Sequence, residues 1–109
     1  MEDINEILKV LKEKNLISDI NGDIKEEFIV DSLDILEGKV IFERDECPYC
    51  SKKSQLIFDI CNLDDKDLFE EIMEYSMEFE IYKCPDCSIY YIFIEKEDYD
   101  KYAKMVIKW

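Results

Sequence analysis

The chain has 109 residues, of which 28 are Asp or Glu and 14 are Lys or Arg, so its formal net charge is −14. A protein this acidic is repelled by nucleic acid and by anionic membrane surfaces. We expect its partners to be basic protein surfaces, such as that of a nuclease or another nucleic-acid-handling protein. Hydrophobic residues make up 48% of the chain, which excludes that the whole chain is disordered, and the length predicts a single domain over residues 1–109.

The sequence also bears on where the protein works. No apolar run approaches the roughly 20 residues that span a bilayer. The acidic start, Met1–Asp3, lacks the basic residues of a signal peptide. These features predict a cytoplasmic protein, in which reduced thiols favour metal binding over disulfides for the five cysteines.

The N-terminal part, residues 1–38, starts with a predicted amphipathic helix over residues 3–14. Apolar side chains recur there at the spacing of one helix face: Ile4, Ile7, Leu8 and Leu11. Asn21 and Gly22 then indicate a turn.

Residues 24–44 fit two patterns. They can form a helix that is capped near Asp23 and ends before Gly38. They can equally form strands over 28–33 and 39–44, and their β-branched content favours the strands. In that interpretation Val40, Ile41 and Phe42 form a strand that leads into the first cysteine motif.

The remaining chain alternates between strand and helix patterns. A strand is expected at 56–60, a helix at 64–77, strands at 78–83 and 88–94, and a last helix at about 97–107. The last helix is predicted because Tyr99, Tyr102, Ala103 and Val106 have helical spacing.

Two matched cysteine motifs carry the clearest chemical signal. Cys47–Cys50 reads Cys-Pro-Tyr-Cys, and Cys84–Cys87 reads Cys-Pro-Asp-Cys. Two intervening residues let both sulfurs of a turn reach one metal at about 2.3 Å, and two such turns complete a tetrahedron without an open position. We therefore predict one structural Zn²⁺, held by Cys47, Cys50, Cys84 and Cys87, whose binding contributes folding free energy.

A strand, a Cys-Pro-x-Cys turn and a returning strand, present twice, resemble the zinc ribbon superfamily. The resemblance covers about residues 39–95, with residues 64–77 as a helical insertion, and it implies an antiparallel sheet closed by zinc. It leaves the biological role open, because ribbons serve transcription, translation, enzymes and scaffolds alike. Many such turns have Gly after the second cysteine, where φ is often positive, whereas this chain has Ser51 and Ser88.

Two other resemblances concern the same cysteines. Cys47–Cys50 looks like the dithiol site of glutaredoxins, in which the first cysteine attacks disulfides. That fold needs a cis-proline facing the site, and the only other proline here is Pro85, inside the second motif. Rubredoxin has iron in the same four-thiolate cage. For the fifth cysteine, Cys61, we expect a small buried apolar residue at a strand end, with metal assistance or an intermolecular disulfide as alternatives.

The helix predicted at 64–77 is strongly acidic. From Asp64 to Glu80 there are eight acidic residues and one basic residue, Lys66. A solvated helix face is one explanation. The other is a surface that binds a basic partner and mimics a nucleic-acid backbone, because lysines at the usual balancing positions are absent. The candidate partner-binding residues are Asp67, Glu70, Glu71, Glu74 and Glu78.

These observations predict an α+β fold, with a zinc-ribbon-like antiparallel sheet, one four-cysteine site, a helical insertion and flanking N- and C-terminal helices. With no His, no Gly-rich loop and no nucleophile dyad, we expect no enzyme activity. We expect an inhibitor or regulator, of the immunity or anti-defence type, that covers a basic nucleic-acid-binding protein surface. The alternatives are a zinc-ribbon adaptor of transcription or translation, and a dithiol oxidoreductase.

Overall fold

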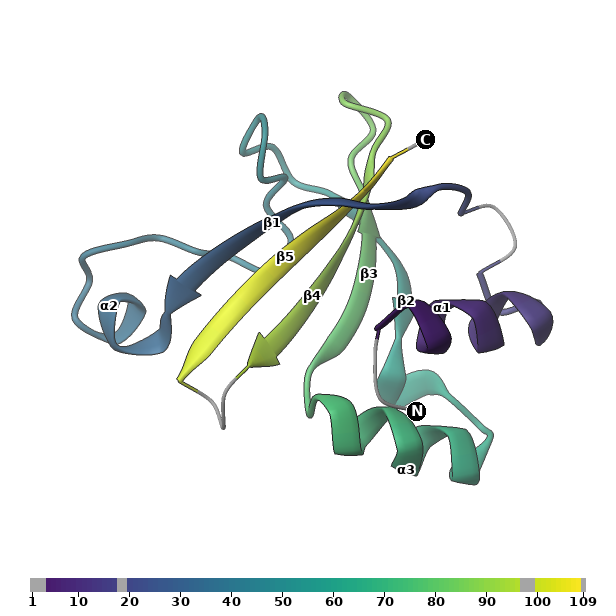
Figure 1. Cartoon of the computed structure of the whole chain (residues 1–109). Coiled ribbons are helices and arrows are strands. Elements are labelled where there is room, and N and C mark those ends of the chain that lie inside the picture. The colour runs from purple at the N-terminus through teal and green to yellow at the C-terminus, as the bar shows by residue number, and fades with distance from the viewer. Residues whose placement is uncertain (1–3, 18–19, 97–99, 109) are drawn as a thin grey trace.

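A computed structural model describes residues 4–17, 20–96 and 100–108 of the chain. Its described part is an α+β fold built on a five-stranded antiparallel sheet with strand order β1-β5-β4-β3-β2 (Figure 1). The strands are β1 (Asp23–Asp31), β2 (Gln55–Asp59), β3 (Phe79–Lys83), β4 (Tyr90–Lys96) and β5 (Lys101–Lys108). The helices are α1 (Ile4–Glu13), α2 (Ser32–Leu36) and α3 (Lys66–Tyr75), with a short 3₁₀ turn at Ile60–Asn62.

The sheet is a meander of β2 to β5, to which β1 adds at the far edge. Within the meander β2 pairs with β3, β3 with β4 and β4 with β5, and the first strand, β1, pairs with the last, β5. Near the middle of the sheet, Ile92 of β4 lies between Ile81 of β3 and Met105 of β5. The first and last strands along the chain are therefore neighbours in the sheet.

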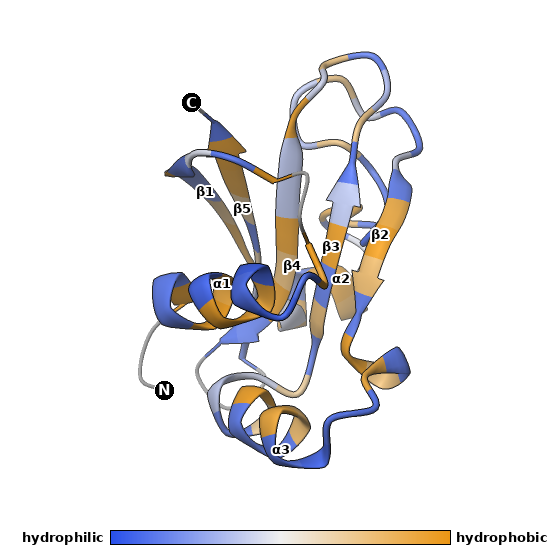
Figure 2. Ribbon diagram, turned by 90° about the vertical axis from the view of Figure 1, so that its right-hand side faces the viewer, coloured by the Kyte–Doolittle hydropathy of each residue, from blue (hydrophilic) through white to orange (hydrophobic). Residues whose placement is uncertain are grey.

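The main core lies between the sheet and the helices α1 and α3. Both helices turn apolar stripes towards it, including Ile7 and Leu11 of α1 and Ile72 of α3, all fully buried. Long hydrophobic stretches of β4 and β5 supply the other side (Figure 2). Alternate strand residues such as Ile92 and Ile94 belong to the same core as the buried helix residues, as expected for the two-residue period of a strand.

The opposite face of the sheet is covered by the segment of residues 37–54, which forms no strand. Phe42 packs on Phe93, with ring centroids 6.2 Å apart. Arg44, the only arginine of the chain, bonds the carboxylates of Glu78 and Glu80. Side-chain contacts therefore hold this segment where backbone pairing does not.

A buried lysine also anchors this segment. The Lys104 side chain projects from β5, is only 2% exposed, and donates to the carbonyl oxygens of Glu43 (2.5 Å) and Glu46 (2.6 Å). Its ammonium also lies 4.5 Å from the ring centroid of Phe42. Burial lowers the pKa of Lys104 to about 8, against the opposing effect of nearby carboxylates, so the ammonium is still mostly charged at pH 7.

Most of the elements predicted from the sequence are confirmed, with ends that differ by no more than two residues. These are the helices at 3–14, whose first residue lies outside the described part, and 64–77, and the strands at 56–60, 78–83 and 88–94. Within the ambiguous segment, the strand predicted at 28–33 is correct up to Asp31, and Ser32 then begins α2.

Two of the predicted helices and strands are wrong. The helix expected at 97–107 is instead β5 over Lys101–Lys108, and residues 97–99 lie outside the described part. Because β5 is covered on both faces, its apolar residues occupy consecutive positions and show no alternation, so they also match helical spacing. The strand expected at 39–44, including Val40–Phe42, is also absent from the described chain, since this segment has no neighbouring strand and is held by side chains.

The anchoring by Lys104 predicts that the variant Lys104→Met is destabilised by roughly 1–3 kcal/mol, measured by urea unfolding. Methionine keeps most of the apolar volume, but it leaves the carbonyls of Glu43 and Glu46 without this donor. The matched control Lys39→Met alters an exposed lysine and should change the free energy of unfolding by less than about 0.5 kcal/mol. Equal stability of Lys104→Met and the wild type would show that the ammonium does not anchor the segment.

Candidate metal centre

The two cysteine turns meet at one end of the sheet, the end away from α3 (Figure 1). The Sγ atoms of Cys47 and Cys87 are 3.9 Å apart, and those of Cys50 and Cys84 are 3.6 Å apart. All four sulfurs lie within 4.8 Å of one another. A tetrahedron with metal–sulfur bonds of about 2.3 Å has sulfur–sulfur edges of about 3.8 Å, so the four cysteines fit a four-thiolate metal site.

The two turns have the same backbone structure. In the first, the N–H of Cys47 donates to the carbonyl of Lys52 (2.9 Å), and the N–H of Ser51 donates back to the carbonyl of Cys47 (2.9 Å). Cys84, Ile89 and Ser88 repeat both bonds at 3.0 Å in the second turn. This repetition, at a separation of 37 residues in the sequence, presents two cysteine pairs to a common point.

The serine after each turn adopts the left-handed conformation anticipated from the sequence. The φ angles of Ser51 and Ser88 are 61° and 56°. A non-glycine residue there costs on the order of 1–2 kcal/mol. Metal binding, with an apparent free energy of about 10–16 kcal/mol in structural zinc sites, exceeds that cost several-fold.

Backbone N–H groups point at the sulfurs and favour their ionised form. The N–H of Tyr49 lies 3.4 Å from Sγ of Cys47, and that of Cys87 lies 3.4 Å from Sγ of Cys84. Burial opposes ionisation of both thiols. It raises the pKa of Cys47, whereas at Cys84 the hydrogen bonds outweigh burial and lower the pKa to about 7.

Aromatic and charged contacts connect the first turn to the edge of the sheet. Tyr49 packs edge-on against Phe28 of β1, with ring centroids 5.7 Å apart, and the Lys108 ammonium lies 4.6 Å from the Tyr49 ring. An ion pair of 2.6 Å between Lys52 and Asp86 joins the two turns directly. The four sulfurs are thus held by the β3–β4 hairpin on one side and by contacts to β1 and β5 on the other.

The structure confirms the β3–β4 hairpin around the second motif but differs at the first. There β2 supplies the returning strand, while the incoming side has only an isolated bridge between Glu46 and Lys53. Likewise, no helix begins at Cys47–Cys50, which lies in a turn. The described residues therefore hold a four-cysteine cluster in an antiparallel α+β fold, and the zinc-ribbon identity stays a resemblance.

The prediction that Cys61 is buried is wrong. Cys61 is exposed in the 3₁₀ turn after β2, and its backbone N–H donates to the carboxylate of Asp59 (3.0 Å). The strand ends one residue earlier than its apolar pattern suggests, and the turn brings the thiol to the surface. The negative charge of Asp59 raises the pKa of Cys61, and Cys61 is not among the four clustered cysteines.

The predicted partner-binding residues do not form one stripe. Asp67, Glu70, Glu71 and Glu74 are exposed on α3, and no cation of the described chain is within ion-pairing distance of their carboxylates. The helix ends at Tyr75, so the fifth residue, Glu78, leaves this face and pairs with Arg44 at 3.2 Å. We call the four helical residues the acidic face of α3. Their carboxylates are the candidate partner-binding groups that have no ion-pairing cation among the described residues.

Comparisons with known proteins give no family. No protein-family model matches the chain, and searches of curated proteins and of solved structures found no match. Within the described residues, no helix is long and apolar enough to cross a membrane.

The geometry fits one metal ion per chain, which we expect to be zinc, lost in the variant Cys84→Ser and retained in the control Cys61→Ser. Cys84 is one corner of the tetrahedron, whereas Cys61 lies outside it. Metal content after passage over a chelating resin, measured by mass spectrometry, checks this. Loss of the ligand should also lower stability by several kcal/mol, because metal binding contributes to folding. Retention of a full zinc equivalent by Cys84→Ser would contradict the assignment, as would its loss in Cys61→Ser.

Proposed function

We propose that the chain is a non-enzymatic binding module in which a structural Zn²⁺ holds the fold and an acidic surface binds a basic protein partner. The observation that carries this proposal is the set of four sulfurs at tetrahedral spacing. A site with four protein ligands leaves no position for substrate or water, which is the arrangement of structural zinc sites. When bound, the metal supplies folding free energy and fixes the two turns relative to each other.

The same cluster weighs against the dithiol oxidoreductase. A redox-active pair needs one accessible, activated thiol, usually at a helix N-terminus. Cys47 is buried instead, and its sulfur lies 3.9 Å from that of Cys87 in the other turn. All four cysteines therefore act together as one ligand set.

The acidic face of α3 supports a basic partner. Its four carboxylates are exposed and lack counter-ions among the described residues. The full chain has a net charge of −14. Like charges held close together on a helix destabilise it unless an opposite charge binds there. We place the chain among inhibitors or regulators that cover a basic, nucleic-acid-binding protein surface. A zinc-ribbon adaptor of transcription or translation is the alternative class, and direct binding of DNA or RNA by the chain would favour it.

Neutralising the acidic face should slow association with the partner. The partner is first identified by capture on zinc-loaded protein at low salt and by mass spectrometry. We expect the variant Asp67→Asn/Glu70→Gln/Glu71→Gln/Glu74→Gln to lower its association rate constant at least about tenfold at low ionic strength, because steering by charge sets that rate. Near-physiological salt should narrow this difference through screening.

The matched control removes four exposed carboxylates elsewhere: Glu13→Gln/Asp23→Asn/Asp31→Asn/Glu43→Gln. The control has the same net charge as the α3 variant. An equal fall of its association rate constant would mean that total charge matters and the α3 face does not. An association rate that is unchanged by salt would contradict electrostatic steering altogether.

A further inference from the structure

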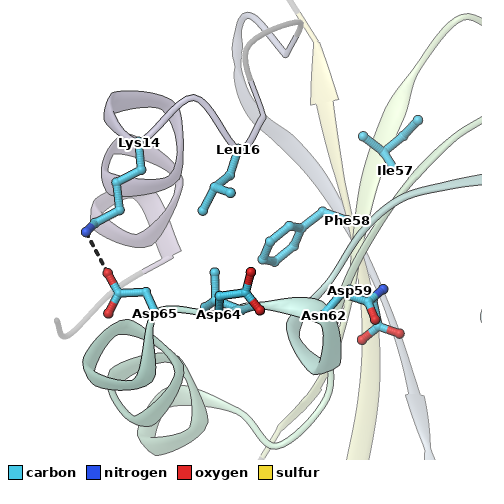
Figure 3. A pocket seen from close by; sticks show the side chains of 9 residues that line it. Lys14, Leu16, Ile57, Phe58, Asp59, Asn62, Asp64 and Asp65 are labelled. Atoms are coloured by element: carbon cyan, nitrogen blue, oxygen red, sulfur yellow. Dashed lines mark hydrogen bonds and ion pairs between the residues drawn. The ribbon is translucent and has the colours of Figure 1, made fainter.

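A cavity of about 450 Å³ opens beside the acidic face, between the end of α1, β2 and the turn that leads into α3 (Figure 3). Its volume is within the range of small-ligand pockets. Nothing in the sequence indicated it, because its lining comes from three separate segments. The lining residues are Lys14, Leu16, Ile57, Phe58, Asp59, Asn62, Leu63, Asp64 and Asp65.

Apolar side chains form the walls of the cavity. Phe58 is 8% exposed and is fixed by edge-on packing against Phe79, with ring centroids 6.1 Å apart. Leu16, 40% exposed, faces it across the hollow (Figure 3). Leu63 also lines the cavity, which is open to solvent.

Carboxylates surround the apolar walls. Three aspartates and one lysine line the cavity, which leaves two negative charges. The lysine, Lys14, is already paired with Asp65 at 2.7 Å, and Asp65 also accepts from the N–H of Leu68 at the start of α3. Asp59 accepts from the N–H of Cys61, which uses only part of its acceptor capacity.

Asp64 is the carboxylate that remains available. It is exposed, and no cation of the described chain lies within ion-pairing distance of it. Figure 3 shows its side chain beside the hollow between Leu16 and Phe58. The cavity therefore combines apolar walls with an unneutralised carboxylate at their edge.

We infer that this cavity binds a long cationic side chain, an arginine or lysine presented by the basic partner protein. The aliphatic part of such a side chain suits the walls formed by Leu16, Phe58 and Leu63, while its charged end reaches Asp64 and Asp59. A guanidinium can also bond a carboxylate through two parallel N–H groups and lie near an aromatic ring. An anionic ligand is disfavoured by the net charge of the lining.

This inference rests on the proposed function, since it names the element of the partner that is recognised, but it can be tested without the partner. The probe is N-acetyl-L-arginine amide, titrated into ¹⁵N-labelled, zinc-loaded full-length protein. We expect saturable shifts of the amide resonances of Leu16, Phe58, Leu63 and Asp64, with millimolar affinity. The citrulline analogue has nearly the same shape without the charge and should not produce them.

Variants then locate the charge that matters. Asp64→Asn should weaken probe binding by up to about fivefold, as expected for loss of one exposed ion pair. Glu70→Gln is the matched control, because it removes one charge from the same acidic region at a residue that does not line the cavity. Leu16→Lys places an ammonium over the hollow and should abolish binding. Thermal unfolding of each variant confirms that it is folded.

Three results would overturn the inference: no saturable shift, equal binding of the citrulline analogue, or equal weakening by Glu70→Gln and Asp64→Asn. Failure here is distinguishable from failure of the proposed function. If neutralising the α3 face slows partner association while the probe does not bind, the binding module stands and the cavity has no anchoring role. If the probe binds and the partner's association rate is unaffected by the α3 variant, the cavity binds a cationic side chain and the role proposed for the acidic face of α3 fails.

Discussion

Convergence of four thiols from two turns is the constraint on which the rest of the structure depends. The sulfurs of Cys50 and Cys84 are 3.6 Å apart although the residues are 34 positions apart in the sequence. Close thiolates repel each other, and a dication bound to all four would remove that repulsion and close a long loop. The closure ties residues 37–54, which have no neighbouring strand, to the β3–β4 hairpin, so the second face of the sheet becomes buried.

Scarcity of positive charge shapes the remainder of the molecule. The chain has 14 basic residues against 28 acidic ones, and several of them serve internal contacts. Lys104 and Arg44 hold the covering segment on the sheet, and Lys14 pairs with Asp65 beside the cavity. Cations used in this way are not available to the surface of α3. The acidic face is therefore partly a consequence of how the fold is held together.

The sequence predicted those features that depend on local spacing. The cysteine motifs, the amphipathic helices and the left-handed residues after each turn follow from patterns within a few positions. Features that depend on distant contacts were missed. β5 was mistaken for a helix because both of its faces are covered, so its apolar residues do not alternate. Residues 40–42 were mistaken for a strand because their apolar side chains match a strand pattern, whereas the segment has no neighbouring strand and is held by contacts such as that of Lys104 with Phe42. The exposure of Cys61 and the cavity at Phe58 depend on where β2 ends and how α1 packs, which no local pattern encodes.

The central claim is that Cys47, Cys50, Cys84 and Cys87 hold one metal ion as its complete set of ligands. X-ray absorption at the zinc edge of the purified full-length protein tests this most directly. We expect a first shell of four sulfur atoms at about 2.3 Å and no nitrogen or oxygen ligand. A shell with three sulfurs or fewer and a light atom at about 2.0–2.2 Å would contradict it, because the site would then have an open position and the metal would not be purely structural.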